Sequence, residues 1–155
     1  MLTSLLQPPD STICGPVAVA MATGVSVDVA VAAFGVTMSD GASIPEIVGA
    51  LEKLGYVTER VIRTRGNRKI RRIPSFCIAI MDHKDTRYLH SVAIEDGFVY
   101  DPGIGYPFPL HVYEDYIMYS ASYASWRKVR DEIKVIPARW RAFIPIVKPP
   151  QLVSA

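Results

Sequence analysis

The spacing of apolar residues changes once along this chain, near residue 55. Before that point apolar side chains recur every three or four residues, as on one face of a helix, and after it they alternate with polar ones, as in a strand. Helices followed by a run of strands favour an α+β fold, with the N-terminal helices packed on an antiparallel sheet. The 155 residues suffice for one such domain. We expect it to span 1–147, with 148–155 as an extended C-terminal tail.

Three helices are predicted in the first 55 residues, over the ranges 14–24, 26–35 and 43–55. The last has the clearest signal, because Ser43 and Glu46 have the spacing of a capping box and apolar residues follow on one face. Each range ends at a glycine, which suits a helix C-terminus. The apolar stretch 13–36 is therefore interpreted as two short buried helices, because a membrane span needs about 20 predominantly apolar residues in one run.

Strands are predicted in the rest of the chain, over 56–62, 75–81, 88–94, 98–100, 108–112 and 142–147. The strongest signal is Asp96-Gly97, since Asp-Gly between alternating apolar residues favours a two-residue hairpin turn. In that register Glu95 pairs with Phe98, and His90 lies on the same sheet face as Asp101, as its diagonal neighbour. A shift of one residue would place those two side chains on opposite faces.

The segment 113–132 has no firm assignment from its pattern. Its tyrosines have helical spacing, which indicates a packed helix face; they are Tyr113, Tyr116, Tyr119 and Tyr123.

Cys14 stands where a loop meets a predicted helix N-terminus. The helix dipole and free backbone N–H groups stabilise a thiolate at that position and so lower the pKa of the thiol. A histidine oriented by a carboxylate and facing such a cysteine is the arrangement of a cysteine hydrolase. Cys14, His90 and Asp101 are therefore candidate catalytic residues. The alternative is a small buried cysteine, a surface histidine and a turn aspartate; Cys77, within an apolar run, is expected in the core.

Four short motifs follow one another in the first 102 residues: Gln7, Cys14-Gly-Pro-Val-Ala, His90-Ser-Val-Ala-Ile and Val99-Tyr-Asp-Pro. In this order they resemble the papain-like cysteine peptidases, and most of all the bacteriocin-processing (double-glycine leader) peptidases and their stand-alone relatives. The resemblance covers residues 7 to about 110. It implies a papain-like fold and a cysteine peptidase that hydrolyses a peptide or isopeptide bond, with Gly-Gly as a cleavage sequence.

The resemblance also implies a role for each matched residue. Cys14 is the nucleophile, His90 its general base and later acid, and Asp101 orients the imidazole. Gln7 donates its amide to the oxyanion hole beside the Cys14 backbone N–H. Leader-processing peptidases are usually fused to a transporter with an ATPase, whereas this chain shows no membrane span and no phosphate loop. An acyl transferase on the same triad is an alternative, because the acyl-enzyme can pass to an amine.

Seven basic residues lie within the thirteen residues 60–72, whereas the rest of the chain carries ten basic and fifteen acidic ones. Such a segment can bind a charged partner, with Arg65, Arg68, Arg71 and Arg72 as candidate residues. A catalytically idle binding module that acts through this loop is a second alternative to an enzyme. A solvated loop is the favoured interpretation of the segment, and nucleic acid is not expected, because no aromatic residue interleaves these positions.

Composition excludes other classes of protein. Half of the residues are hydrophobic and the net charge is only +2, so the chain is neither disordered nor a polyanion binder as a whole. Two cysteines exclude a disulfide-rich framework. His83, His90 and His111 lack zinc-ligand spacing, so no metal or cofactor is expected. No signal peptide is recognised, and a cytoplasmic location is expected. A virus-encoded origin and the oligomeric state stay open.

Overall fold

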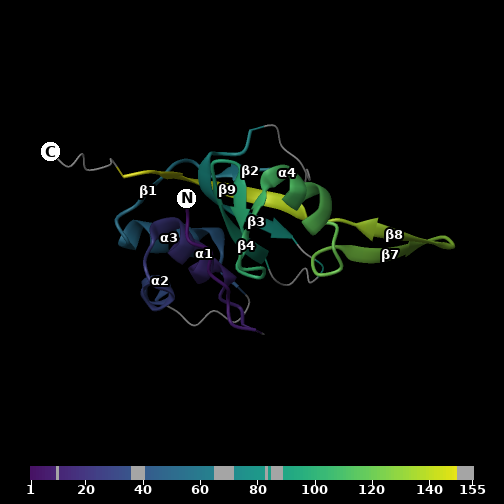
Figure 1. Cartoon of the computed structure of the whole chain (residues 1–155), viewed down its shortest axis with the longest axis horizontal. Helices are drawn as coiled ribbons and strands as arrows, with labels where there is room; N and C mark the ends of the chain where they lie inside the picture. Colours follow the sequence, from purple (N-terminus) through teal and green to yellow (C-terminus); the bar gives the residue numbers. More distant parts are fainter. Residues whose placement is uncertain (10, 36–40, 65–71, 83, 85–88, 150–155) are drawn as a thin grey trace.

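The computed structural model describes residues 1–9, 11–35, 41–64, 72–82, 84 and 89–149. Within these ranges three N-terminal helices lie on one side of an antiparallel sheet (Figure 1). The helices are α1 (Cys14–Thr23), α2 (Val27–Phe34), α3 (Ile44–Lys53) and the short α4 (Leu110–Val112), which continues into a π-helical turn, η1 (Tyr113–Ile117). The strands are β1 (Val57–Thr58), β2 (Ile62–Arg63), β3 (Phe76–Asp82), β4 (Leu89–Glu95), β5 (Phe98–Tyr100), β6 (Pro107–Pro109), β7 (Ser125–Val129), β8 (Glu132–Ile136) and β9 (Arg139–Val147). The α+β class is therefore confirmed.

The main sheet has the strand order β1-β9-β3-β4-β5-β6, and β2 also pairs with β9. Its two faces are covered by different apolar clusters. The helix-side cluster joins α1, α2 and α3 to side chains such as Ile78 and Ile144. The opposite cluster contains Met81, Val92 and Trp140. The strands β3 and β4 are buried almost throughout because both of their faces are covered.

The three N-terminal helices begin and end where the sequence predicts. The helix α1 ends at Gly24, whose φ of 78° lies in the left-handed region. Ser26 caps α2 by accepting a hydrogen bond from the Val29 backbone N–H. At α3 the capping box is complete, because the Ser43 hydroxyl accepts from the Glu46 N–H and the Glu46 carboxylate accepts from the Ser43 N–H.

No single helix in the described ranges is long and apolar enough to cross a membrane. The helices α1 and α2 reach the required length and hydropathy only when they are taken together, and they are bent by 119° at the break between them. The prediction of two short helices in the stretch 13–36 is confirmed, and α1 is buried along most of its length.

The central hairpin has the predicted register. Glu95 pairs with Phe98, Ile94 with Val99 and Ala93 with Tyr100, so the turn is Asp96-Gly97. Asp101 follows directly on the last paired residue of β5.

Two other strand predictions need correction. The predicted strand 56–62 is split into β1 and β2, whose registers against β9 differ by one residue. Pro145 of β9 lies opposite the break, and its missing N–H removes a bond from the ladder there. The predicted strand 108–112 is wrong in its second half. It pairs with β5 only as far as Pro109, after which the chain turns into α4.

The unassigned segment contains η1 and the strand β7, which pairs with β8 as a separate two-stranded sheet. This hairpin projects away from the rest of the molecule (Figure 1). The predicted packed face of four tyrosines is wrong. Tyr113 and Tyr123 are buried, but Tyr116 is 70% exposed and Tyr119 is 40% exposed.

The close approach of α1 to the loop before α3 generates the first testable prediction. A Cβ built on Gly15 would lie 2.6 Å from the Cβ of Ala42, too close for two carbon atoms. We expect Gly15→Ala to lower the free energy of unfolding by about 1–3 kcal/mol, as for other overpacked sites. Equilibrium unfolding in urea measures the change.

Gly49→Ala in α3 is the matched control, because nothing lies within 4 Å of a Cβ built there. We expect it to raise the free energy of unfolding by about 0.5–1 kcal/mol, since alanine is the better helix former. Equal effects of the two substitutions would contradict the close packing at Gly15.

Candidate active site

Cys14 is the first residue of α1 and is buried at the end of the main sheet. Its helix packs on the helix-side cluster, and its sulfur atom reaches the first residues of β4. The Sγ atom lies 3.7 Å from the carbonyl oxygen of Leu89. The imidazole of the next residue, His90, lies on the side of this sulfur and lowers the pKa of the thiol. The N-terminus of α1 therefore places the thiol against the start of β4.

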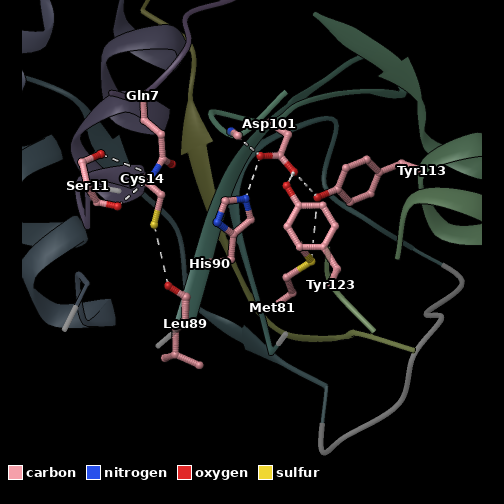
Figure 2. A network of polar contacts seen from close by, with 10 residues as sticks. Gln7, Ser11, Cys14, Met81, Leu89, His90, Asp101, Tyr113 and Tyr123 are labelled. Carbon is pink, nitrogen blue, oxygen red and sulfur yellow. Dashed lines mark hydrogen bonds and ion pairs between the residues drawn. The ribbon is translucent and has the colours of Figure 1, made fainter. Parts of the chain in front are cut away.

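His90 lies between Cys14 and Asp101 (Figure 2). Its Nε2 atom is 2.7 Å from Oδ1 of Asp101, and its other ring nitrogen faces the side of the cysteine. The sequence predicted that His90 and Asp101 share a sheet face, and the geometry has this feature. Asp101 bonds the ring nitrogen that points away from Cys14. The three residues predicted as a triad are therefore brought together, from α1, β4 and the end of β5.

The Asp101 carboxylate is fully buried and accepts four hydrogen bonds. His90 and the backbone N–H of Gly103 both donate to Oδ1, at 2.7 Å each. The hydroxyls of Tyr113 and Tyr123 donate to Oδ2, at 2.6 and 2.8 Å. Four donors fill the acceptor capacity of an ionised carboxylate, so Asp101 is held as an anion with a single orientation.

Gly103 permits this arrangement because it has no side chain. A Cβ at this position would lie 2.9 Å from the Tyr123 hydroxyl and 3.2 Å from Oδ1 of Asp101. The Asp101-Pro-Gly turn therefore brings a backbone N–H to the carboxylate where a larger residue would displace it.

Sequence reasoning missed Tyr113 and Tyr123 as members of the site. They come from different elements, the π-helical turn η1 and the loop before β7, and only tertiary packing brings them to Asp101. Tyr123 also lies against the His90 ring, with a distance of 5.2 Å between the ring centroids. One signal was available. A buried carboxylate needs hydrogen-bond donors, and the segment 113–132, which had no assigned structure, carries four tyrosine hydroxyls that can donate.

The pKa of the Cys14 thiol results from opposing effects. Burial raises it, but the hydrogen bond and positive charge of His90 and the backbone N–H of Ser91 bring the pKa below its ordinary value. The Leu89 carbonyl favours the protonated thiol, but at 3.7 Å it is a weak partner. The site therefore favours a thiolate at Cys14.

His90 and Asp101 are both held in their charged forms. Burial alone would lower the pKa of His90, but the charge and hydrogen bond of Asp101 raise it to about 10. Burial would raise the pKa of Asp101, whereas His90, Tyr113 and the Gly103 N–H hold it below its usual range. The surroundings of the three groups therefore favour thiolate, imidazolium and carboxylate.

Gln7 lies next to Cys14 (Figure 2). Its backbone N–H donates to the carbonyl oxygen of Pro102 at 2.8 Å, which ties the N-terminal segment to the turn after Asp101. Its carboxamide Nε2 donates to the carbonyl oxygen of Ser11 at 3.0 Å. The Oε1 atom is buried and has no hydrogen-bond partner among the described residues. The structure thus places Gln7 at the site, with an amide that is only partly satisfied.

A groove of about 410 Å³ opens onto this row of residues. Residues 6–9 of the N-terminal segment line it together with His90, Gly103 and Tyr123. A ligand in the groove therefore meets the imidazole and the glutamine directly.

The remaining candidate residues divide into two groups. Arg65, Arg68 and Arg71 lie outside the described residues, and Arg72 is exposed. Cys77 is buried in the core, as predicted, and burial raises the pKa of its thiol well above the ordinary value. Across the part of the chain that the structure describes, no three His, Cys, Asp or Glu side chains gather closely enough to hold a metal ion.

Comparisons with known proteins do not place the chain in a family. No model of a known protein family matches it, and no curated protein matches its sequence.

The opposite pKa directions of the two cysteines generate a second prediction. We expect iodoacetamide to alkylate Cys14 well below pH 9 and Cys77 far more slowly, because only Cys14 has a lowered pKa. Mass spectrometry of peptides from samples quenched over time measures both rates across the pH range.

Cys14→Ser is the control, and in this variant fast labelling must disappear. Two thiols that react equally, both with an ordinary thiol pKa, would show that His90 does not stabilise a thiolate.

The tyrosine hydroxyls on Asp101 generate a third prediction. We expect Tyr113→Phe and Tyr123→Phe each to lower the free energy of unfolding at neutral pH by about 1.5–3 kcal/mol, as for hydrogen bonds to charged groups. The lowered pKa of Asp101 gives stability that is present above its unfolded pKa and is lost as the pH falls through its folded pKa. A missing donor raises the folded pKa, so both variants should lose stability at a higher pH than the parent does.

Tyr116→Phe is the matched control, because that side chain is 70% exposed. Urea unfolding over a series of acidic buffers compares the three variants. A Tyr116→Phe effect as large as the other two would contradict a specific role for the hydrogen bonds to Asp101.

Proposed function

We propose that this chain is a papain-like cysteine peptidase, in which Cys14 attacks the carbonyl carbon of a peptide or isopeptide bond. The observation that carries the proposal is the position of the His90 ring, between the Cys14 sulfur and the buried Asp101 carboxylate. The imidazole can exchange a proton with the sulfur on one side while the carboxylate holds its other nitrogen.

The reaction follows from this row of charges. The Cys14 thiolate forms a bond to the carbonyl carbon, and the carbonyl oxygen becomes negative. The C–N bond then breaks, and the leaving amine takes the proton of the His90 imidazolium, which leaves a thioester on Cys14. Neutral His90 next removes a proton from water, whose oxygen attacks the thioester. The acid product leaves, and thiolate and imidazolium are restored.

The oxyanion is expected beside the N-terminus of α1. The Cys14 backbone N–H is one donor there, because the first N–H groups of a helix have no partner within it. Gln7 supports a second donor. Its Nε2 atom carries two hydrogens; the Ser11 carbonyl accepts one at 3.0 Å, and the second makes only a long contact of 3.4 Å with the Ser11 hydroxyl, which an oxyanion would replace. Gln7 also lies in the wall of the groove, where the carbonyl oxygen of a bound peptide would be.

The resemblance to leader-processing peptidases suggests Gly-Gly before the cleaved bond. Two prolines, Gly103 and Tyr123 are among the residues that line the groove. Among ordinary residues glycine brings the least bulk to the reacting carbonyl.

The experiment is hydrolysis of a peptide library that contains Gly-Gly, with products identified by mass spectrometry. We expect Cys14→Ala to abolish turnover. Gln7→Ala should lower kcat about 10²–10³-fold with little change in KM, as for other oxyanion donors. Iodoacetamide should alkylate Cys14 in the Gln7→Ala variant at the parent rate, because that reaction forms no oxyanion.

Three other outcomes would overturn parts of the proposal. Transfer of the acyl group to an added amine in preference to water indicates a transferase on the same triad. A Cys14 that is alkylated rapidly but turns over no peptide indicates a binding module. Full turnover by Gln7→Ala would place the oxyanion donors elsewhere.

A further inference from the structure

A second pocket lies on the helix side of the sheet, close to the reactive sulfur. Its volume is about 530 Å³, and three arginines line it: Arg63, Arg139 and Arg141. Leu89, whose carbonyl oxygen is 3.7 Å from the Cys14 sulfur, is also part of its wall. Leu89 therefore lines the pocket and also contacts the Cys14 sulfur.

The sheet register explains how the arginines come together. Leu89 pairs with Asp82 across β4 and β3, and Asp82 pairs with Arg139 across β3 and β9. Next to this row the register of β9 shifts by one residue, and Arg141 is the extra residue. Such a bulge redirects side chains, and here it leaves Arg141 on the pocket side while Trp140 faces the opposite cluster.

The third arginine comes from β2, where Arg63 pairs with Ala142 of β9. Within the described ranges it has no carboxylate partner. Asp82 offsets part of the charge, because its Oδ1 is 3.2 Å from Nε of Arg141 and its Oδ2 is 3.9 Å from Arg139. Among the described residues, three arginines line the pocket and Asp82 is the carboxylate paired with two of them, so positive charge is in excess there. A carboxylate is the anion of a peptide that fits this excess.

The remaining walls are apolar, formed by residues such as Ile44 and Ile80. Apolar walls lower the local dielectric constant and strengthen a nearby ion pair, and they suit the methylene groups of a glutamate side chain. Two strand spacings separate Leu89 from Arg139, about 10 Å. An extended peptide covers that distance in about three residues.

We propose that this arginine pocket, defined by Arg63, Arg139 and Arg141, is a subsite that binds a carboxylate of the peptide substrate about three residues from the bond that Cys14 attacks. The inference rests on the proposed function and specifies its substrates: the enzyme prefers peptides with an acidic group about three residues from the cleaved bond. The carboxylate comes from an acidic side chain or from the end of the peptide chain.

The test measures how well peptides protect Cys14 from iodoacetamide, so it requires no turnover. The probes are acetylated and amidated peptides with a central Gly-Gly and one glutamate, placed three residues before it or three residues after it. Each is compared with the same peptide carrying glutamine. A third form has glutamine and a free C-terminal carboxylate at the same distance, which distinguishes the two sources of the acid.

For the parent protein at low salt, one acidic probe should protect Cys14 at about two- to fivefold lower concentration than its glutamine counterpart, the range for a partly exposed ion pair. Arg63→Gln should reduce this ratio towards one. Among the described residues Arg63 has no carboxylate partner, so the substitution breaks no ion pair there, and the alkylation rate of each variant without peptide serves as its own reference. Arg127→Gln, on the projecting hairpin, is the matched control and should keep the full ratio.

Equal protection by acidic and neutral probes would overturn the subsite, as would a preference that survives both Arg63→Gln and Arg141→Gln. These results are distinct from a failure of the proposed function. A chain that is no peptidase would leave every probe uncleaved, whereas the protection ratio reports the pocket alone.

Discussion

A carboxylate without access to water has a large free-energy cost unless donors replace the lost hydration. Asp101 is such a group, and it is satisfied by donors from three separate parts of the chain: the start of β4, its own turn, and the segment 113–123. The requirement for these donors explains features that otherwise have no reason. It accounts for a glycine at position 103, for the π-helical turn that begins at Tyr113, and for the loop that returns Tyr123 to the sheet.

The charge on Asp101 also determines the state of the residues in front of it. It holds His90 as an imidazolium, and the imidazolium in turn favours the thiolate of Cys14. The row crosses the end of the sheet, from the face that the helices cover to the face that Tyr113 and Trp140 cover. Neither apolar cluster could form the site alone. The Cys14 thiol belongs to α1 on the helix side, whereas the Asp101 carboxylate is held by Tyr113 and Tyr123 of the opposite cluster.

Local signals were enough for the parts of the fold whose geometry is set by near neighbours. Ser43 and Glu46 predicted α3 because capping depends on residues three positions apart, and Asp96-Gly97 predicted the hairpin register that aligns His90 with Asp101. The hairpin of β7 and β8 had no such signal. Its turn contains Arg130 at a φ of 58°, a conformation for which glycine or asparagine would have been the recognisable choice.

The rest of the site depends on contacts that no local pattern encodes. Tyr113 and Tyr123 reach Asp101 through tertiary packing, whereas Tyr116, of the same residue type and spacing, is exposed. The position of Arg141 in its pocket depends on a bulge, and a bulge is decided by how β9 fits against β3. The sequence therefore predicted the three aligned residues of the site, but not the groups that hold them in place.

The groups of the site are unevenly spaced along the chain, and this affects when during folding the site is assembled. His90 and Asp101 are 11 residues apart and Tyr123 follows 22 residues after Asp101, whereas Cys14 and Leu89 are separated by 75 residues. Contacts between distant residues carry the larger loop-closure cost and form late. During synthesis Cys14 emerges long before its partners, so the nascent chain carries an ordinary thiol. The pKa of the thiol is lowered only when α1 docks on β4, which makes the thiolate a property of the finished fold.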